Sequence, residues 1–226
     1  MRELFIGNKN YSTWSMRPWL VLKFFQIEFK EQLIPFDDFH PDQAAFKQRI
    51  LKVNPTGKVP ALVDDGLLIW DSLAICEYLA ESFPEKHLWP SDRVLRARAR
   101  SISAEMHSGF TTLRNLCGMN IEADLSEVGQ KLWQEHAALR ADVARIEQIW
   151  SERPDDNGFL CGQFSIADAF YAPVVMRFIS FKLPISKKTQ QYMDLMLSVP
   201  AIQTWIVEAK QEQQFVAIDE PYRTSR

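Results

Sequence analysis

The 226-residue sequence predicts a small α/β domain followed by an all-helical domain. Over residues 1–82, short strand-like runs alternate with helix-like runs, which is typical of an α/β layer. Two prolines and several charged residues then mark residues 83–93 as a linker. Residues 94–226 show mainly the spacing of apolar side chains that indicates amphipathic helices.

The first domain is expected to run in the order β-α-β, a further helix, then β-β-α. Its first six predicted elements cover residues 3–7, 15–26, 29–36, 41–53, 60–64 and 67–70, and the helix at 41–53 opens on a proline. Asp65-Gly66 separates the last two strands, and this dipeptide favours a two-residue hairpin because both central positions need positive φ. Asp71 or Ser72 can then cap a final helix.

The second domain is predicted to contain five helices. They cover residues 94–116, 127–150, 166–181, 187–197 and 199–210. Ser165 and Asp168 match a capping box at the start of the third helix, with Asp in place of the usual Glu. That helix also contains Pro173.

Charge and cysteine content narrow the possible partners. A formal net charge of −3, from 26 basic and 29 acidic side chains, gives no general attraction to nucleic acid or to anionic membranes. Neither the three cysteines nor the four histidines show metal-ligand spacing, so we expect no metal. The amino terminus lacks the apolar core of a signal peptide, and no run approaches the length of a membrane span. We therefore expect a cytoplasmic protein.

Two short motifs suggest a ligand with the polarity of a peptide. Pro60 has no N–H that could donate a hydrogen bond within a sheet. At the start of a strand it therefore either protects the edge of the sheet or forms a cis turn that exposes the backbone of Val59. That backbone could pair with an extended ligand, although many such prolines merely begin a strand. Asp71 and Ser72, at a helix start, could hold an ammonium and a carboxylate, and simple capping is the alternative.

Three segments resemble the glutathione transferase superfamily, most nearly serine-type members of the zeta class, whose relatives isomerise maleylacetoacetate. They read "YSTWSMRPWLVLKFFQI", "NPTGKVPALVDDGLLIWDSLAICEYLAE" and "GQFSIADAFYAPVV". The resemblance implies a thioredoxin-like first domain that binds glutathione, an all-helical second domain, an electrophile bound between the two, and a homodimer.

The resemblance also implies roles for individual residues. Val59 would pair with the cysteinyl unit of glutathione, and Pro60 would be cis. Asp71 and Ser72 would hold the γ-glutamyl end, and Lys58 would meet a glutathione carboxylate.

Ser12, Thr13 and Ser15 are the candidate catalytic hydroxyls. Glutathione's thiolate is the nucleophile, and a hydroxyl that donates a hydrogen bond to sulfur at a helix start favours this ionised form. Only the first four N–H groups of a helix lack internal acceptors, so Pro18 costs no hydrogen bond if the helix is capped at Ser15 or later. Because capping would then occupy Ser15, we rank Ser12 first, Thr13 second and Ser15 third.

Other residues are expected near the site with less specificity. Trp14 and Arg17 lie close in sequence to the candidate hydroxyls, so both could contribute to the site. Equally, Trp14 could simply pack between the domains, and Arg17 could be a solvated helix residue. Zeta-like members carry a cysteine where this chain has Trp14, which leaves the isomerase chemistry open. Four further residues are expected on the helices that line the electrophile pocket, although they could equally belong to the hydrophobic core. They are Phe110, Arg114, Met119 and Arg177.

The leading functional prediction is an enzyme, a glutathione transferase that adds the thiolate to a small hydrophobic electrophile. Cis-trans isomerisation of the maleylacetoacetate type and peroxide reduction are alternatives, and a non-catalytic binding or scaffold protein of the same fold is a further one. A disulfide reductase is disfavoured because residues 1–75 contain no cysteine. The nucleophile must then arrive with the ligand.

Overall fold

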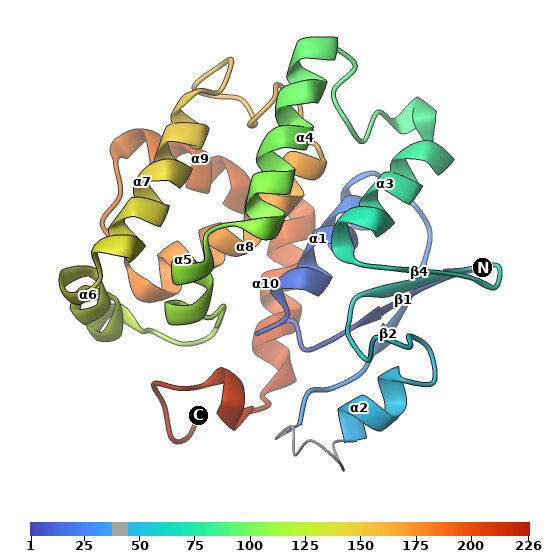
Figure 1. Cartoon of the computed structure of the whole chain (residues 1–226), viewed down its shortest axis with the longest axis horizontal. Helices are drawn as coiled ribbons and strands as arrows, with labels where there is room; N and C mark the ends of the chain where they lie inside the picture. The colour runs from blue at the N-terminus through green and yellow to red at the C-terminus, as the bar shows by residue number, and fades with distance from the viewer. Residues whose placement is uncertain (38–44) are drawn as a thin grey trace.

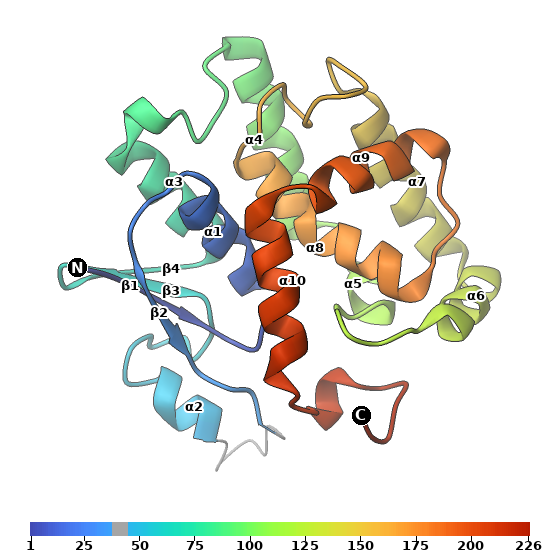
Figure 2. The same ribbon diagram turned by 180° about the vertical axis from the view of Figure 1, so that it is seen from behind.

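Residues 1–37 and 45–226, which the computed structural model describes, form a four-stranded sheet with an adjoining bundle of helices (Figures 1 and 2). The strands are β1 (Arg2–Ile6), β2 (Lys30–Leu33), β3 (Ala61–Asp64) and β4 (Leu67–Trp70), in the order β2-β1-β3-β4. β1 is parallel to β2 and antiparallel to β3, and β3 is antiparallel to β4. This mixed sheet and the helices after it confirm the predicted fold class.

Alternating side chains of β1 contribute to two apolar clusters. Leu4 and Ile6 are buried with α1 (Thr13–Phe24) and α3 (Ser72–Ser82), whereas Phe5 packs with a smaller cluster that includes α2 (Ala45–Ile50). Parallel strands need a crossover connection, and α1 supplies the one between β1 and β2. Because α1 also contacts the bundle, the start of this helix lies where the two parts of the chain meet.

The predicted order of elements in the first 82 residues is confirmed. Asp65 and Gly66 have φ of 47° and 89°, as a tight hairpin requires, and the side chain of Asp71 caps α3. The helix predicted over 41–53 is described only from residue 45, and its opening on Pro41 lies outside the described residues. η1 (Pro84–Lys86) is the one regular element described between α3 and α4 (Arg93–Ser108), and the division into domains at 83–93 stays a prediction.

The predicted start of the helix at Ser15 is wrong. α1 begins at Thr13 because the Met16 N–H already bonds the Ser12 carbonyl at 3.1 Å, and Pro18 therefore lies inside the helix. A proline at this depth removes the N–H that would bond the carbonyl of Trp14. Burial of nine of the twelve residues of α1 outweighs that loss.

The remaining helices surround α8 (Ile166–Phe181), whose residues are almost all buried. They are α5 (Thr111–Leu116), α6 (Ser126–Glu135), α7 (Ala137–Ser151), α9 (Lys187–Leu197) and α10 (Pro200–Glu212), followed by the short turn η2 (Ala217–Asp219). Figure 2 shows α10 running between the sheet and the rest of the bundle. No helix in the described part of the chain is long and apolar enough to cross a bilayer.

Two long predicted helices are each broken into two. The helix expected over 94–116 ends at Ser108, and Phe110 adopts the left-handed region at φ 54° before α5 begins. The helix expected over 127–150 is interrupted at His136, whose backbone is extended. Apolar spacing continues on both sides of each break, so periodicity alone does not detect them.

The capping box at the start of α8 is confirmed. Asp168 is fully buried and its carboxylate accepts hydrogen bonds from the backbone N–H of Ser165 and of Leu160, each at 2.9 Å. The Tyr192 hydroxyl donates a third at 3.0 Å. This one side chain therefore joins the start of α8 to the preceding loop and to α9.

We expect Asp168→Ala to lower the free energy of unfolding by about 2–4 kcal/mol, because several buried donors lose their acceptor at once. Urea titration followed by circular dichroism measures the change. Asp156→Ala is the matched control, since its carboxylate is exposed and, among residues 1–37 and 45–226, pairs with the exposed Lys188 alone, at 3.2 Å. Equal stability of the two variants would show that the buried network contributes nothing.

Candidate functional site

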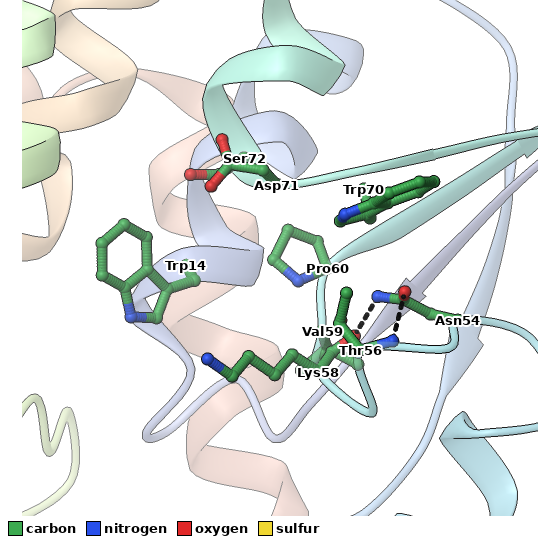
Figure 3. A pocket seen from close by; sticks show the side chains of 9 residues that line it. All are labelled: Trp14, Asn54, Thr56, Lys58, Val59, Pro60, Trp70, Asp71 and Ser72. Carbon is green, nitrogen blue, oxygen red and sulfur yellow. Dashed lines mark hydrogen bonds between the residues drawn. The ribbon is translucent and has the colours of Figure 1, made fainter.

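Two adjoining pockets form one cleft where the sheet domain meets the bundle. They have volumes of about 450 and 390 Å³ and share Trp14, Lys58 and Val59. The first pocket lies over the ends of β3 and β4 and the start of α3 (Figure 3). The second reaches across to α5, α8 and the carboxy-terminal turn η2. We call the whole the interdomain cleft.

The segment from Asn54 to Pro60 forms one edge of the first pocket. Asn54 is buried, and its side chain donates to the Lys58 carbonyl at 2.8 Å and accepts from the Thr56 N–H at 3.1 Å (Figure 3). The Val59-Pro60 bond is cis, which confirms the expectation from the resemblance. Within the described residues, no backbone hydrogen bond uses Val59. Its peptide groups are therefore available to a ligand.

The start of α3 forms the opposite edge. Asp71 Oδ1 accepts from the Leu73 and Ala74 N–H groups at 2.8 and 3.3 Å. The Ser72 hydroxyl is buried and has no hydrogen-bond partner among the described residues, although Ser72 lines the pocket (Figure 3). An unpartnered buried hydroxyl at a helix start is a ready donor to an anion, and the neighbouring carboxylate of Asp71 favours a cation.

His107 of α4 is part of this edge, and the sequence did not reveal it. Its Nε2 lies 3.2 Å from Asp71 Oδ2, and its ring meets the edge of Trp14 with ring centres 5.3 Å apart. Burial lowers the pKa of His107, while the Asp71 carboxylate opposes that effect. Both oxygens of Asp71 are thus engaged, one with α3 and one with α4.

Ser12 and Thr13 line the second pocket, whereas Ser15 lines neither pocket. Ser12 Oγ donates to Ser15 Oγ at 2.7 Å, and Ser15 Oγ also accepts from the Gly7 N–H at 3.2 Å. The expectation that Ser15 caps the helix is therefore wrong: the N-cap position is Ser12, and its side chain makes no capping bond. Ser15 instead holds the end of β1 and supports Ser12 from behind.

Arg17 lies behind the cleft and not in it. It is 2% exposed and lies between the rings of Trp14 and Phe170, at 4.2 and 4.6 Å from their centres. Its Nε and Nη1 have no hydrogen-bond partner among the described residues. Burial, with the charges of Arg114 and Arg177, lowers the pKa of Arg17 to about 9. Trp14 itself separates Arg17 from the cleft and lines both pockets.

The bundle gives the second pocket a cationic wall. Arg114, Met119 and Arg177 line it, but Phe110 does not, because the chain break places it in the core. Arg177 is buried and donates to the carbonyl groups of Arg114, at 3.3 Å, and of Cys117. Burial lowers the pKa of Arg177 to about 10.

One acid lines the same pocket, and no sequence signal pointed to it. Asp219, at the end of η2, is the one Asp or Glu among the described residues that line the second pocket. Burial first, and the charge of Glu220 second, raise the pKa of Asp219 to about 6. Ser12 and Thr13 therefore share a pocket with three cationic side chains and one weak acid.

Asn10 ties the loop that carries the hydroxyls to the bundle. It is 2% exposed, and its Oδ1 accepts from the N–H groups of Ile121 and Glu122 at 2.8 and 3.0 Å. Its Nδ2 donates to Asn120 Oδ1 at 3.0 Å. These contacts join the loop to the segment that follows Met119 in the pocket wall.

The structure thus brings eight of the ten predicted site residues to one cleft and places Ser15 and Arg17 directly behind it. The eight are Ser12, Thr13, Trp14, Lys58, Val59, Pro60, Asp71 and Ser72. Their individual roles stay predictions.

Comparisons with known proteins identify relatives over most of the chain. The family model described as glutathione S-transferase, N-terminal domain, matches residues 11–82, and that of the C-terminal domain matches residues 120–207. A maleylacetoacetate isomerase from Rattus norvegicus is 31% identical, over 77% of this chain and 76% of its own. Glutathione S-transferase GstA from Escherichia coli O157:H7 is 32% identical, over 67% of this chain and 73% of its own.

Solved structures share the fold. A glutathione transferase homologue from Burkholderia, solved with bound glutathione, superposes with a TM-score of 0.69. It is 23% identical in sequence, and the superposition covers 93% of this chain and 98% of that one. The predicted resemblance is therefore confirmed at the level of sequence family and fold.

We expect Asn10→Ala to lower the free energy of unfolding by about 2–3 kcal/mol, because buried N–H donors are left without an acceptor. Amide hydrogen exchange should also become faster at Ile121 and Glu122, which would lose their acceptor. Asn157→Ala, at an exposed position, is the control. Unchanged exchange at both amides would contradict the assigned role of Asn10.

Proposed function

Because the chain belongs to the glutathione S-transferase family, we propose that it binds glutathione in the interdomain cleft, ionises the thiol and adds it to a small electrophile. The observation that carries this proposal is the unpartnered, buried hydroxyl of Ser72 in the same cleft as the unused backbone of Val59 and the hydroxyls of Ser12 and Thr13. One extended tripeptide can engage all three groups.

The γ-glutamyl end would lie at the start of α3. Its carboxylate would accept from the Ser72 hydroxyl and face the positive end of the helix, and its ammonium would face the carboxylate of Asp71. His107 would hold the Asp71 carboxylate in place, because its Nε2 lies 3.2 Å from Asp71 Oδ2. Both charges of an amino-acid head group are thus matched.

The cysteinyl and glycyl units would follow the cis-proline segment. The peptide groups of Val59 would pair with the cysteinyl backbone, as a strand pairs with its neighbour. Lys58 is exposed, and its side chain extends toward Trp14 (Figure 3), where its ammonium would meet the glycyl carboxylate. This arrangement would direct the sulfur toward the start of α1.

Hydroxyl groups at the start of α1 would stabilise the thiolate. The Ser12–Ser15 hydrogen bond can run in either direction, because hydroxyl hydrogens rotate. If Ser15 donates to Ser12, the Ser12 hydrogen is released for the sulfur, while the Gly7 N–H continues to support Ser15. Each unit by which the thiol pKa falls corresponds to about 1.4 kcal/mol in favour of the thiolate.

The cationic wall favours an electrophile that becomes negative as sulfur adds to it. Arg114 and Arg177 of this wall, together with Lys58 of the sheet domain, would stabilise such developing charge in a partly enclosed pocket. This observation gives weight to a second candidate, thiolate-assisted cis-trans isomerisation, in which an adduct forms and then reverts. Isomerases of this type are among the named relatives.

We further propose a homodimer in a reducing, cytoplasmic setting. The three cysteines are free and buried, which suits a compartment rich in thiols. Leu67 and Trp70 of β4 and Val94 of α4 are exposed apolar side chains that a second copy could cover.

The proposal is tested by the absorbance of the bound thiolate and by variants at Ser12 and Thr13. Wild-type protein should show thiolate absorbance on adding glutathione at neutral pH. Ser12→Ala should raise the pKa of the bound thiol by about one unit and lower kcat/KM near pH 7 about tenfold, with little change in affinity. Thr13→Val should have the smaller effect.

Ser72→Ala is the matched control at the other end of the cleft. It should weaken glutathione binding while leaving the thiol pKa of the bound form unchanged. Absence of binding by the wild-type protein would falsify the proposal, and binding without turnover of any electrophile would favour the scaffold alternative.

A further inference from the structure

Asp219 is held in the cleft by a carboxy-terminal segment that is itself anchored. Its neighbour Glu220 is 3% exposed and accepts from the Tyr11 hydroxyl at 2.8 Å and from Arg223 Nη2 at 2.6 Å. The Tyr222 hydroxyl donates to the Leu116 carbonyl at 2.7 Å. The turn η2 is therefore fixed on both sides of the cleft, and the position of Asp219 does not depend on its own side chain.

The carboxylate of Asp219 itself forms no hydrogen bond or ion pair with another residue in ranges 1–37 and 45–226. It lines the pocket that also contains Ser12, Thr13 and the cationic wall. A partly buried carboxyl that stabilises nothing in the fold, yet faces the place where an electrophile would react, is available for proton transfer.

Its surroundings suit that task. The charged and titratable groups that line the same pocket come from several elements: Tyr11 before α1, Lys58 before β3, Arg114 of α5 and Arg177 of α8. Glu220, next to Asp219 in the chain, is the group whose charge acts on it. Burial and the charge of Glu220 raise the pKa of Asp219 to about 6. About a tenth of such groups carry a proton at pH 7, and an acid with a pKa near the working pH is an efficient donor.

We propose that Asp219 is a catalytic proton donor, which protonates the electrophile after glutathione thiolate has added to an activated carbon–carbon double bond. This inference rests on the proposed function and concerns the role of Asp219 in reactions whose adduct must take up a proton, as the adduct of an α,β-unsaturated carbonyl compound does. The sulfur lone pair forms the C–S bond, and the π electrons move to the carbonyl oxygen to give an enolate. The proton of the Asp219 carboxyl then passes to the α-carbon.

The proton balance closes through solvent. The thiol loses one proton to solvent when it ionises in the site, and the Asp219 carboxylate regains one from solvent after the transfer. Arg114 and Arg177 would stabilise the enolate, and Asp219 would then protonate it. Displacement of halide from an activated aromatic ring needs no such proton, because the leaving group departs as an anion.

The two reactions therefore separate the role of Asp219 from a structural one. With an enone, Asp219→Asn should lower kcat about tenfold or more, and the fall of kcat above about pH 6 should disappear from the pH profile. With chlorodinitrobenzene, kcat should change less than about twofold. Asp219→Glu should restore part of the enone activity. Thiolate absorbance of bound glutathione should stay as in the wild type.

Tyr222→Phe is the control for a displaced carboxy-terminal segment. It removes the 2.7 Å hydrogen bond to the Leu116 carbonyl without changing a charge beside Asp219, so it should affect both substrates alike. An equal effect of Asp219→Asn on both substrates, no effect on either, or a wild type that turns over only the aromatic halide would overturn the inference and leave the proposed function intact. A wild type that does not bind glutathione would overturn both.

Discussion

The position of the loop between β1 and α1 is the constraint on which the site depends. Lys9 is 5% exposed, and its ammonium pairs with Glu31 at 2.7 Å and with Glu208 of α10 at 2.5 Å, beside the rings of Trp19 and Trp205. An ammonium buried this deeply is stable only while both carboxylates stay in place. The sheet and the bundle therefore share one buried charge next to the candidate hydroxyls, and their relative position fixes the cleft.

Charge is divided between the two halves of the cleft in a way that suits one ligand and one reaction. The half at α3 offers the Ser72 hydroxyl and the Asp71 carboxylate, which match an amino-acid head group. The half at the bundle concentrates positive charge, with Arg17 behind Trp14 adding to that of Arg114 and Arg177. Placing three guanidinium groups so close costs stability, and the proposed reaction, in which negative charge develops on the electrophile, would give that cost a function.

Much of the fold and half of the site could be predicted from the sequence, because the deciding contacts there are local. The hairpin at Asp65-Gly66 and the capping box at Ser165 depend on neighbours a few residues away. Other features depend on segments far apart in the chain: the burial of α1 that offsets the bond lost at Pro18, the place of His107 beside Asp71, and the place of Asp219 in the pocket. No periodicity or cap records such contacts, so only the folded chain reveals them.

A crystal structure with glutathione bound tests the assigned cleft most directly. We expect the sulfur to lie within hydrogen-bond distance of the hydroxyl of Ser12 or Thr13. We also expect the Val59 backbone to pair with the cysteinyl unit and the γ-glutamyl carboxylate to meet Ser72. A glutathione molecule whose sulfur lies away from both hydroxyls, or whose γ-glutamyl end is held elsewhere, would contradict this assignment.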